Sequence, residues 1–115
     1  MKQITNTLKA LSDEIRLRII NILYDQELCV CEIVDALSLP QSTVSRHLTV
    51  LKNANIVEDI KHGQWAFYKL LKGKEDDSFI ENLIKSELRA NSEFQKDIES
   101  LKKRLEKGRG CLIKN

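Results

Sequence analysis

The sequence predicts a mainly α-helical protein that carries one small β-hairpin. Three observations support this fold class. Apolar residues recur at helical spacing over most of the chain. A single pair of β-type runs meets at His62-Gly63. One proline and four glycines among 115 residues leave few breaks in the helices, and a chain of this length supports one domain.

The composition limits the expected partners and location. The apolar fraction of 42% and the charged fraction of 31% are globular values. The formal net charge is only +2, so binding to nucleic acid would depend on where the cations lie. No apolar run approaches the ~20 residues that span a bilayer, and the N-terminus lacks the apolar core of a signal peptide. We therefore expect a cytoplasmic protein whose three cysteines are reduced.

The first half of the chain predicts a buried helix followed by a helix-turn-helix. Residues 2–11 have helical apolar spacing, and the run from Ile15 to Tyr24 is apolar on more than one face, as in the central helix of a domain. A short amphipathic helix over 29–37 follows. Ser38-Leu39-Pro40 separates it from a helix over 41–53. Helix, three-residue turn and helix form the helix-turn-helix pattern.

The helix over 41–53 has two unlike faces. Val44, Leu48 and Leu51 form one apolar stripe. The other face carries compact hydrogen-bonding groups and a cation, namely Gln41, Ser42, Thr43, Ser45, Arg46, His47 and Thr49. Such groups near a helix N-terminus suit the reading of base edges in a major groove. The alternative is an ordinary amphipathic surface helix.

A predicted hairpin over residues 56–70 follows this helix directly. Lys61, His62 and Gln64 place polar and cationic groups at its turn. A hairpin in this position is the "wing" that reaches the neighbouring phosphate backbone or minor groove. The alternative is a hairpin that only covers the core through Trp65 and Phe67. The three segments together favour a DNA-binding winged helix-turn-helix.

The C-terminal part predicts two further amphipathic helices. An acidic segment at 73–77 leads into a helix with a wide apolar face over 78–88. A second stripe follows over 94–105, after a capping-box spacing at Ser92 and Gln95. This is more apolar surface than a winged domain covers alone, so we expect these helices and residues 2–11 to form a homodimer. The alternative is packing within the chain.

The predicted organisation is a single domain in three parts. Residues 1–75 form the winged core with the N-terminal helix, 76–107 the dimerisation helices, and 108–115 a flexible tail that contains a cysteine. A two-fold dimer would place two reading helices one DNA turn apart, roughly 34 Å, on a pseudo-palindromic operator.

Over residues 4–71 the sequence resembles the ArsR/SmtB family of winged helix-turn-helix, metal-responsive repressors. The resemblance rests on Leu11-Ser-Asp-Glu-Ile-Arg-Leu-Arg-Ile19, Glu27-Leu-Cys-Val-Cys-Glu-Ile33, Gln41-Ser-Thr-Val-Ser-Arg-His-Leu-Thr-Val-Leu51 and Gly63-Gln-Trp65. The Leu-Cys-Val-Cys element resembles the branch that senses arsenite or antimonite. The resemblance implies dimers that repress an operator and leave it when the effector binds. It also implies groove reading by Gln41, Ser42, Ser45 and Arg46, with His47 beside them, and wing contacts by Lys61, His62 and Gln64.

Cys29 and Cys31 are the candidate effector ligands, since soft metalloids prefer thiolates. Within a regular helix, residues i and i+2 point about 200° apart, so two such sulfurs converge only at a helix start. A helix N-terminus would also lower their pKa. The resembled branch commonly has a third thiol where this chain has Val34, which leaves Cys111 in the tail as the candidate third ligand. The alternatives are an idle Cys111 and a pair that is merely buried.

The hypothesis that follows is release by distortion. An ion that binds both thiols would distort the first turn of the helix over 29–37, and the turn at 38–40 would pass the shift to the reading helix. The alternatives are a thiol redox or reactive-sulfur-responsive repressor and a DNA-binding module without an effector. Residues 78–107 lack a zinc-ligand spacing. No glycine-rich phosphate loop or catalytic constellation indicates an enzyme.

Overall fold

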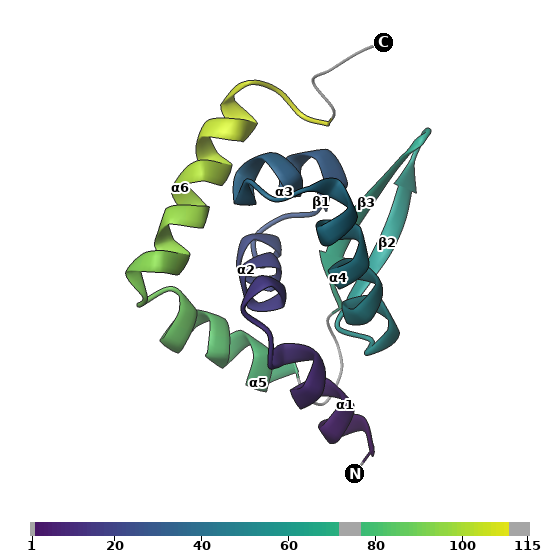
Figure 1. Cartoon of the computed structure of the whole chain (residues 1–115), viewed down its shortest axis with the longest axis vertical. Coiled ribbons are helices and arrows are strands. Elements are labelled where there is room, and N and C mark those ends of the chain that lie inside the picture. Colours follow the sequence, from purple (N-terminus) through teal and green to yellow (C-terminus); the bar gives the residue numbers. More distant parts are fainter. Residues whose placement is uncertain (1, 72–76, 111–115) are drawn as a thin grey trace.

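A computed structural model describes residues 2–71 and 77–110, and confirms a mainly helical fold with a small antiparallel sheet (Figure 1). Its elements are α1 (Lys2–Leu11), α2 (Glu14–Leu23), β1 (Leu28–Cys29), α3 (Val30–Leu37), α4 (Gln41–Asn53), β2 (Val57–His62), β3 (Trp65–Leu70), α5 (Asp77–Asn82), the π-helical η1 (Leu83–Leu88) and α6 (Ser92–Glu106). No helix in the described ranges is both long enough and apolar enough to cross a bilayer.

Helix α2 is the centre of the core, as its apolar composition predicts. Ile19, Ile20 and Ile22 are completely buried, and α2 contacts α3, α4, α6 and β3. The helix begins where the sequence indicates, because the Asp13 side chain accepts hydrogen bonds from the backbone N–H groups of Ile15 and Arg16. The other elements are arranged around this helix.

The helix-turn-helix has the predicted boundaries except at its start, because Cys29 belongs to β1 and caps α3, which begins at Val30. Helix α3 ends at Leu37 and is capped by Ser38, which adopts a left-handed conformation with φ of 56°. Pro40 then precedes the first turn of α4. The apolar stripe of α4 faces inward, with Val44, Leu48 and Leu51 buried. The opposite side of α4 is therefore the side that faces out from the domain.

The sheet has one strand that the sequence does not predict. Its order is β1-β3-β2, with β3 antiparallel to both neighbours. Strand β1 occupies the end of the predicted connector, where Leu28 pairs with Tyr68 and Cys29 pairs with Phe67. A two-residue strand carries too little alternation to be recognised from sequence. Its consequence is that the first cysteine lies beside the wing strand.

The C-terminal helices differ in what they cover. Asn91, not Ser92, caps α6 by accepting the Glu93 N–H at 2.9 Å. The second stripe of the C-terminal part packs within the chain, since α6 lies against α2 and α3 (Figure 1) and Leu101 is buried. Most of the acidic segment at 73–77 lies outside the described residues.

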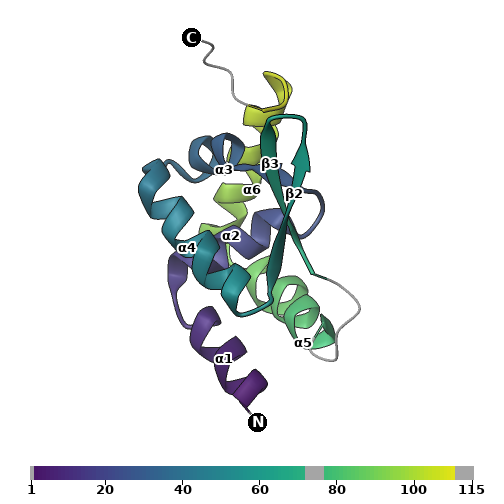
Figure 2. The same cartoon turned by 90° about the vertical axis from the view of Figure 1, so that its right-hand side faces the viewer.

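Helices α1 and α5, in contrast, leave large apolar side chains uncovered. Ile4, Leu8 and Phe79 are 63%, 51% and 47% exposed. Both views show α1 and α5 at the same end of the molecule (Figures 1 and 2). Among the described residues, the large exposed apolar side chains thus lie at that end, away from the stripe on α6.

Candidate functional site

The outer face of α4 presents most of the predicted reading residues. Gln41, Ser42, Arg46 and Thr49 are exposed, while Thr43 and Ser45 are half-buried. The Thr49 hydroxyl donates to the Ser45 carbonyl at 3.0 Å, which fixes its rotamer along the helix. The structure therefore gathers an amide, hydroxyl groups and one guanidinium on a single exposed helix face.

His47 is not on this face, contrary to the sequence prediction. Its ring is buried, and Nδ1 lies 3.1 Å from Arg16 Nη1 and 4.0 Å from an Asp13 carboxylate oxygen. Burial lowers the pKa of His47; Asp13 opposes that shift, and Arg46 and Arg16 add to it. A neutral ring that accepts from Arg16 joins α2 to α4 and does not reach the surface. The signal was in the sequence, since His47 lies three residues after Val44 on the stripe that faces the core.

The wing carries the remaining predicted DNA contacts at its turn. Lys61, His62 and Gln64 are exposed on either side of Gly63, whose φ of 65° suits the tight turn. His62 is already engaged, because its Nε2 lies 2.5 Å from a Glu27 carboxylate oxygen. Lys61 and Gln64 are the more available pair. Strand β2 contacts α4, so the wing and the reading helix belong to one continuous part of the molecule.

Cys29 and Cys31 lie at the start of α3, as predicted. Cys29 ends β1 and caps α3 with an extended backbone (φ −86°, ψ 167°), whereas Cys31 is the second helical residue. Cys29 is 4% exposed and Cys31 is half-buried. Because Cys29 lies outside the regular helix, helix geometry does not force the Cys29 and Cys31 side chains to point in opposite directions.

The expected low pKa of the first thiol is wrong. Burial raises the pKa of Cys29; the Glu32 carboxylate adds to the rise, while the backbone N–H groups of Glu32 and Cys31 oppose it. The helix N-terminus acts in the expected direction but is outweighed by desolvation. The sequence could not show this, because it does not reveal that Cys29 is buried beside β3.

The two cysteines differ in bonding. Cys29 is a free thiol, whereas Cys31 is disulfide-bonded, contrary to the expectation that all the cysteines are reduced. The remaining cysteine, Cys111, lies outside the described residues. Among the residues that are described, no group of three or more His, Cys, Asp or Glu side chains is placed to hold a metal ion. A three-coordinate thiol site would thus need a ligand beyond Cys29 and Cys31.

Glu32 is the residue of this region that the sequence analysis missed. Its side chain is completely buried, and it accepts from Cys29 N–H at 3.0 Å, Arg109 Nε at 2.7 Å and Gly110 N–H at 2.8 Å. Burial alone would raise the pKa of Glu32, but Arg109 and these two N–H groups together lower it. The available signal was its position three residues after the helix cap, which is the acid position of a capping box.

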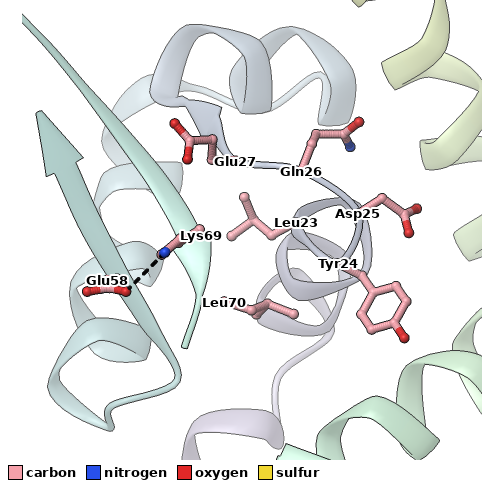
Figure 3. A pocket seen from close by; sticks show the side chains of 8 residues that line it. All are labelled: Leu23, Tyr24, Asp25, Gln26, Glu27, Glu58, Lys69 and Leu70. Carbon is pink, nitrogen blue, oxygen red and sulfur yellow. Dashed lines mark ion pairs between the residues drawn. The ribbon is translucent and has the colours of Figure 1, made fainter. Parts of the chain in front are cut away.

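A shallow cavity of about 280 Å³ lies between the end of α2 and strand β3 (Figure 3). None of the predicted site residues lines it. Its charged groups are already paired, with Glu58 3.6 Å from Lys69 Nζ, Asp25 beside Arg89 and Glu27 beside His62. The cavity therefore offers no separate set of ligand-binding groups.

Comparisons with known proteins agree with this arrangement. Residues 13–59 match the family model described as "Bacterial regulatory protein, arsR family". The chain is 39% identical over 87 residues to the arsenic resistance transcriptional regulator ArsR1 of Pseudomonas putida, covering 75% of this chain and 66% of the relative. It is 38% identical to ArsR2 of the same organism, covering 77% and 76%. A cadmium resistance regulator, the CadC homolog of Staphylococcus aureus, is 34% identical, covering 70% and 64%.

Solved structures share this fold. Reduced HlyU from Vibrio cholerae has a TM-score of 0.66 and 37% identity, covering 73% of this chain and 87% of that one. The homodimeric winged helix-turn-helix DNA-binding domain Mb0332 of Mycobacterium bovis has a TM-score of 0.63 and 26% identity, covering 73% of each. The chain belongs to the arsR family of bacterial regulatory proteins, which are DNA-binding winged helix-turn-helix regulators and not enzymes.

Proposed function

We propose that the protein is the repressor of an arsenical-resistance type operon, released from its operator when arsenite or antimonite binds cysteine thiolates. The observation that carries this proposal is the position of Cys29 and Cys31 at the junction of β1 and α3. This junction precedes the helix-turn-helix, so a change there can reach the reading helix. The arsenic-resistance regulators among the relatives support the choice of effector.

The effector site would use Cys29 and Cys31, with Cys111 as the third thiolate. Gly110 donates its backbone N–H to Glu32, which itself lies one residue after Cys31. Cys111 follows Gly110 directly in the sequence, and this supports the tail as the source of the third ligand. When bound, the metalloid supplies a soft centre that three sulfurs hold in a pyramid. The reduced form of Cys31 is required for this role.

The DNA interface would combine the face of α4 with the wing. Gln41, Ser42, Thr43, Ser45, Arg46 and Thr49 would contact the major groove, and Lys61, His62 and Gln64 the adjacent backbone or minor groove. We further propose a homodimer through the exposed apolar groups of α1 and α5, with two reading helices on a pseudo-palindromic operator. The homodimeric solved relative supports this assembly.

The test is release of the reduced protein from DNA upstream of its own gene, followed by fluorescence anisotropy. Arsenite, antimonite, cadmium and zinc are titrated in parallel. We expect arsenite and antimonite to weaken binding by up to 150-fold, which corresponds to a coupling of about 3 kcal/mol. Cys29→Ser should abolish the release while leaving DNA binding intact. The proposal would be refuted if cadmium or zinc released the DNA and arsenite and antimonite did not. It would also be refuted if the Cys29→Ser protein released DNA as readily as the unmodified protein.

The third ligand is tested separately by X-ray absorption on the arsenite-bound protein. Three sulfurs per arsenic in the unmodified protein and two in Cys111→Ser would support the tail thiol. Two sulfurs in both proteins would remove Cys111 from the site without affecting the assignment of Cys29 and Cys31.

A thiol redox-responsive repressor is the second candidate, and the disulfide at Cys31 favours it. In this mechanism two thiols lose two electrons and two protons to an oxidant such as a hydroperoxide, which is reduced to an alcohol and water. Cys31→Ser would then lose its response to hydroperoxide. Mass spectrometry of the released protein separates the two functions, since binding of arsenite adds one arsenic and removes one hydrogen per thiol bound, with the oxygens leaving as water, whereas oxidation removes only two hydrogens.

A further inference from the structure

Residues 108–110, which we call the C-terminal strap, are bound to the start of α3. Arg109 donates from Nε to one Glu32 oxygen at 2.7 Å and from Nη2 to the other at 3.3 Å. The same Nη2 donates to the Glu27 carbonyl at 2.8 Å. The strap thus bridges the connector before β1 and the first turn of α3.

The burial of Glu32 depends on the strap. An ionised carboxylate that is shielded from water needs a cation and several donors to offset its lost hydration. Among the described residues, Glu32 accepts hydrogen bonds from the Arg109 side chain and the Gly110 N–H, which belong to the strap. It also accepts from the Cys29 N–H, which lies in the same turn of the chain. Without the strap the carboxylate would keep one backbone donor, so α3 and the strap stabilise each other.

The strap also contacts the wing strand β3. The Arg109 guanidinium lies 5.7 Å from the centre of the Phe67 ring. Gly110 packs so closely on Trp65 that an added Cβ would overlap the indole ring, and its φ of 78° also favours glycine. Figure 1 shows α3 between α6 and the hairpin of β2 and β3. The strap is therefore placed between α3 and the wing.

Arg104 holds the strap in this conformation from the last turns of α6. Its guanidinium donates to the carbonyls of Gly108 and Gly110, and its Nε lies 2.5 Å from an Asp35 carboxylate oxygen on α3. The side chain of Arg104 is only 4% exposed. Through these contacts the strap connects α3, α6 and β3.

We propose that the C-terminal strap holds the wing in its DNA-binding position, with Arg109 and Glu32 as the positioning residues. The strap fastens Trp65 and Phe67 of β3 to the start of α3. Because β3 begins directly after the wing turn, fixing β3 also fixes the position of that turn. This role requires that the family's DNA-binding function applies to the chain, but not that the effector is a metalloid. It can therefore fail or succeed independently of the thiol site.

The first test measures the strap without DNA. Trp65 is the only tryptophan of the chain, so its emission reports contact with Gly110. We expect Arg109→Ala and Gly110→Ala to shift the emission to longer wavelength and to speed hydrogen exchange in residues 60–67. Lys102→Ala is the matched control: it removes an exposed cation of α6 that makes no ion pair among the described residues. Unchanged emission and exchange in both strap variants would overturn the proposal.

The second test asks whether removing the negative charge of Glu32 strengthens or weakens DNA binding. Glu32→Gln makes the protein more positive by one, so electrostatics alone predicts tighter binding to a random-sequence duplex of about three helical turns. The proposed role of the strap predicts weaker binding, by about tenfold. The amide NH2 group of the glutamine would face the N–H donors of Arg109 and Gly110, so the strap would lose those hydrogen bonds. The amide oxygen can still accept from Cys29 N–H, which preserves the helix cap. Tighter or unchanged binding by Glu32→Gln, or equal losses in Arg109→Ala and Lys102→Ala, would show that the strap does not position the wing.

Discussion

The ion pair between Arg18 and Asp97 fastens α6 to the helix-turn-helix. Arg18 Nε and Nη2 each donate to a different Asp97 oxygen, at 2.9 Å and 3.0 Å. The same Nη2 donates to the carbonyl of Leu37, the last residue of α3 before the turn. The hydrogen bonds that Arg18 donates to the Asp97 carboxylate raise the pKa of Arg18. One guanidinium therefore links α2, α6 and the end of α3.

We predict that Asp97→Asn lowers the free energy of unfolding by about 2 kcal/mol. Breaking a fully buried pair costs roughly 3–5 kcal/mol, because it strands the partner charge. Here Asp97 is 8% and Arg18 24% exposed, so water recovers part of that cost. Asparagine also keeps one of the two acceptors, and each hydrogen bond to a charged group contributes about 1.5–3 kcal/mol. The corresponding fall in Tm is roughly 10 °C for a chain of this size.

Urea unfolding at a fixed protomer concentration measures this difference, since dimerisation makes the apparent stability depend on concentration. Glu99→Gln is the control, because it removes one exposed carboxylate from α6 that makes no ion pair among the described residues. A double-mutant cycle with Arg18→Gln isolates the pair. If Asp97→Asn costs no more than Glu99→Gln, or the cycle shows no coupling, the pair does not fasten α6.

Three further predictions concern α4 and α1. The pKa of His47 is lower in the folded protein than in the unfolded chain, so on acidification the unfolded chain binds the proton at a higher pH than the folded protein does. The free energy of unfolding should therefore fall as pH drops below about 6.5, until the folded ring is also protonated. His47→Asn, which keeps an acceptor for Arg16, should flatten that part of a urea-midpoint profile. Arg46→Ala should weaken DNA binding by about 1–3 kcal/mol in an anisotropy titration, while His47→Asn changes it little at pH 7.5 or above; equal losses would place His47 on the reading face. Leu8→Asp should shift sedimentation towards the monomer, and an unchanged profile would exclude α1 from the dimer contact.

The local features of the fold were predictable because each had its own sequence signal. Apolar spacing marked α2 and α4, Pro40 marked the start of the second helix, and Gly63 marked the wing turn. The same reasoning placed Cys29 and Cys31 at a helix start. These signals are short-range, so they did not depend on knowing which elements meet.

The features that sequence reasoning missed arise from contacts between distant segments. Strand β1 exists because Leu28 and Cys29 pair with the free edge of β3, which lies some forty residues further along the chain. Cys29 is buried in this strand, and that burial raises its pKa. Glu32 was overlooked because its main partner, Arg109, comes from the end of the described chain. Local signals were also overlooked, since the spacing of His47 and the capping-box position of Glu32 could both be read from the sequence.

Strand β1 changes the route by which the thiol site could act on DNA binding. The sequence suggested one path, from the start of α3 through the turn at 38–40 to α4. Cys29 is also paired with Phe67, so any displacement of its backbone acts on the wing strand as well. The strap adds a third connection, because Arg109 contacts both Glu32 and Phe67. Under the thiol-release proposal, the reading helix and the wing would therefore leave the DNA together, and a variant that uncouples only the α3–α4 turn would keep part of the response.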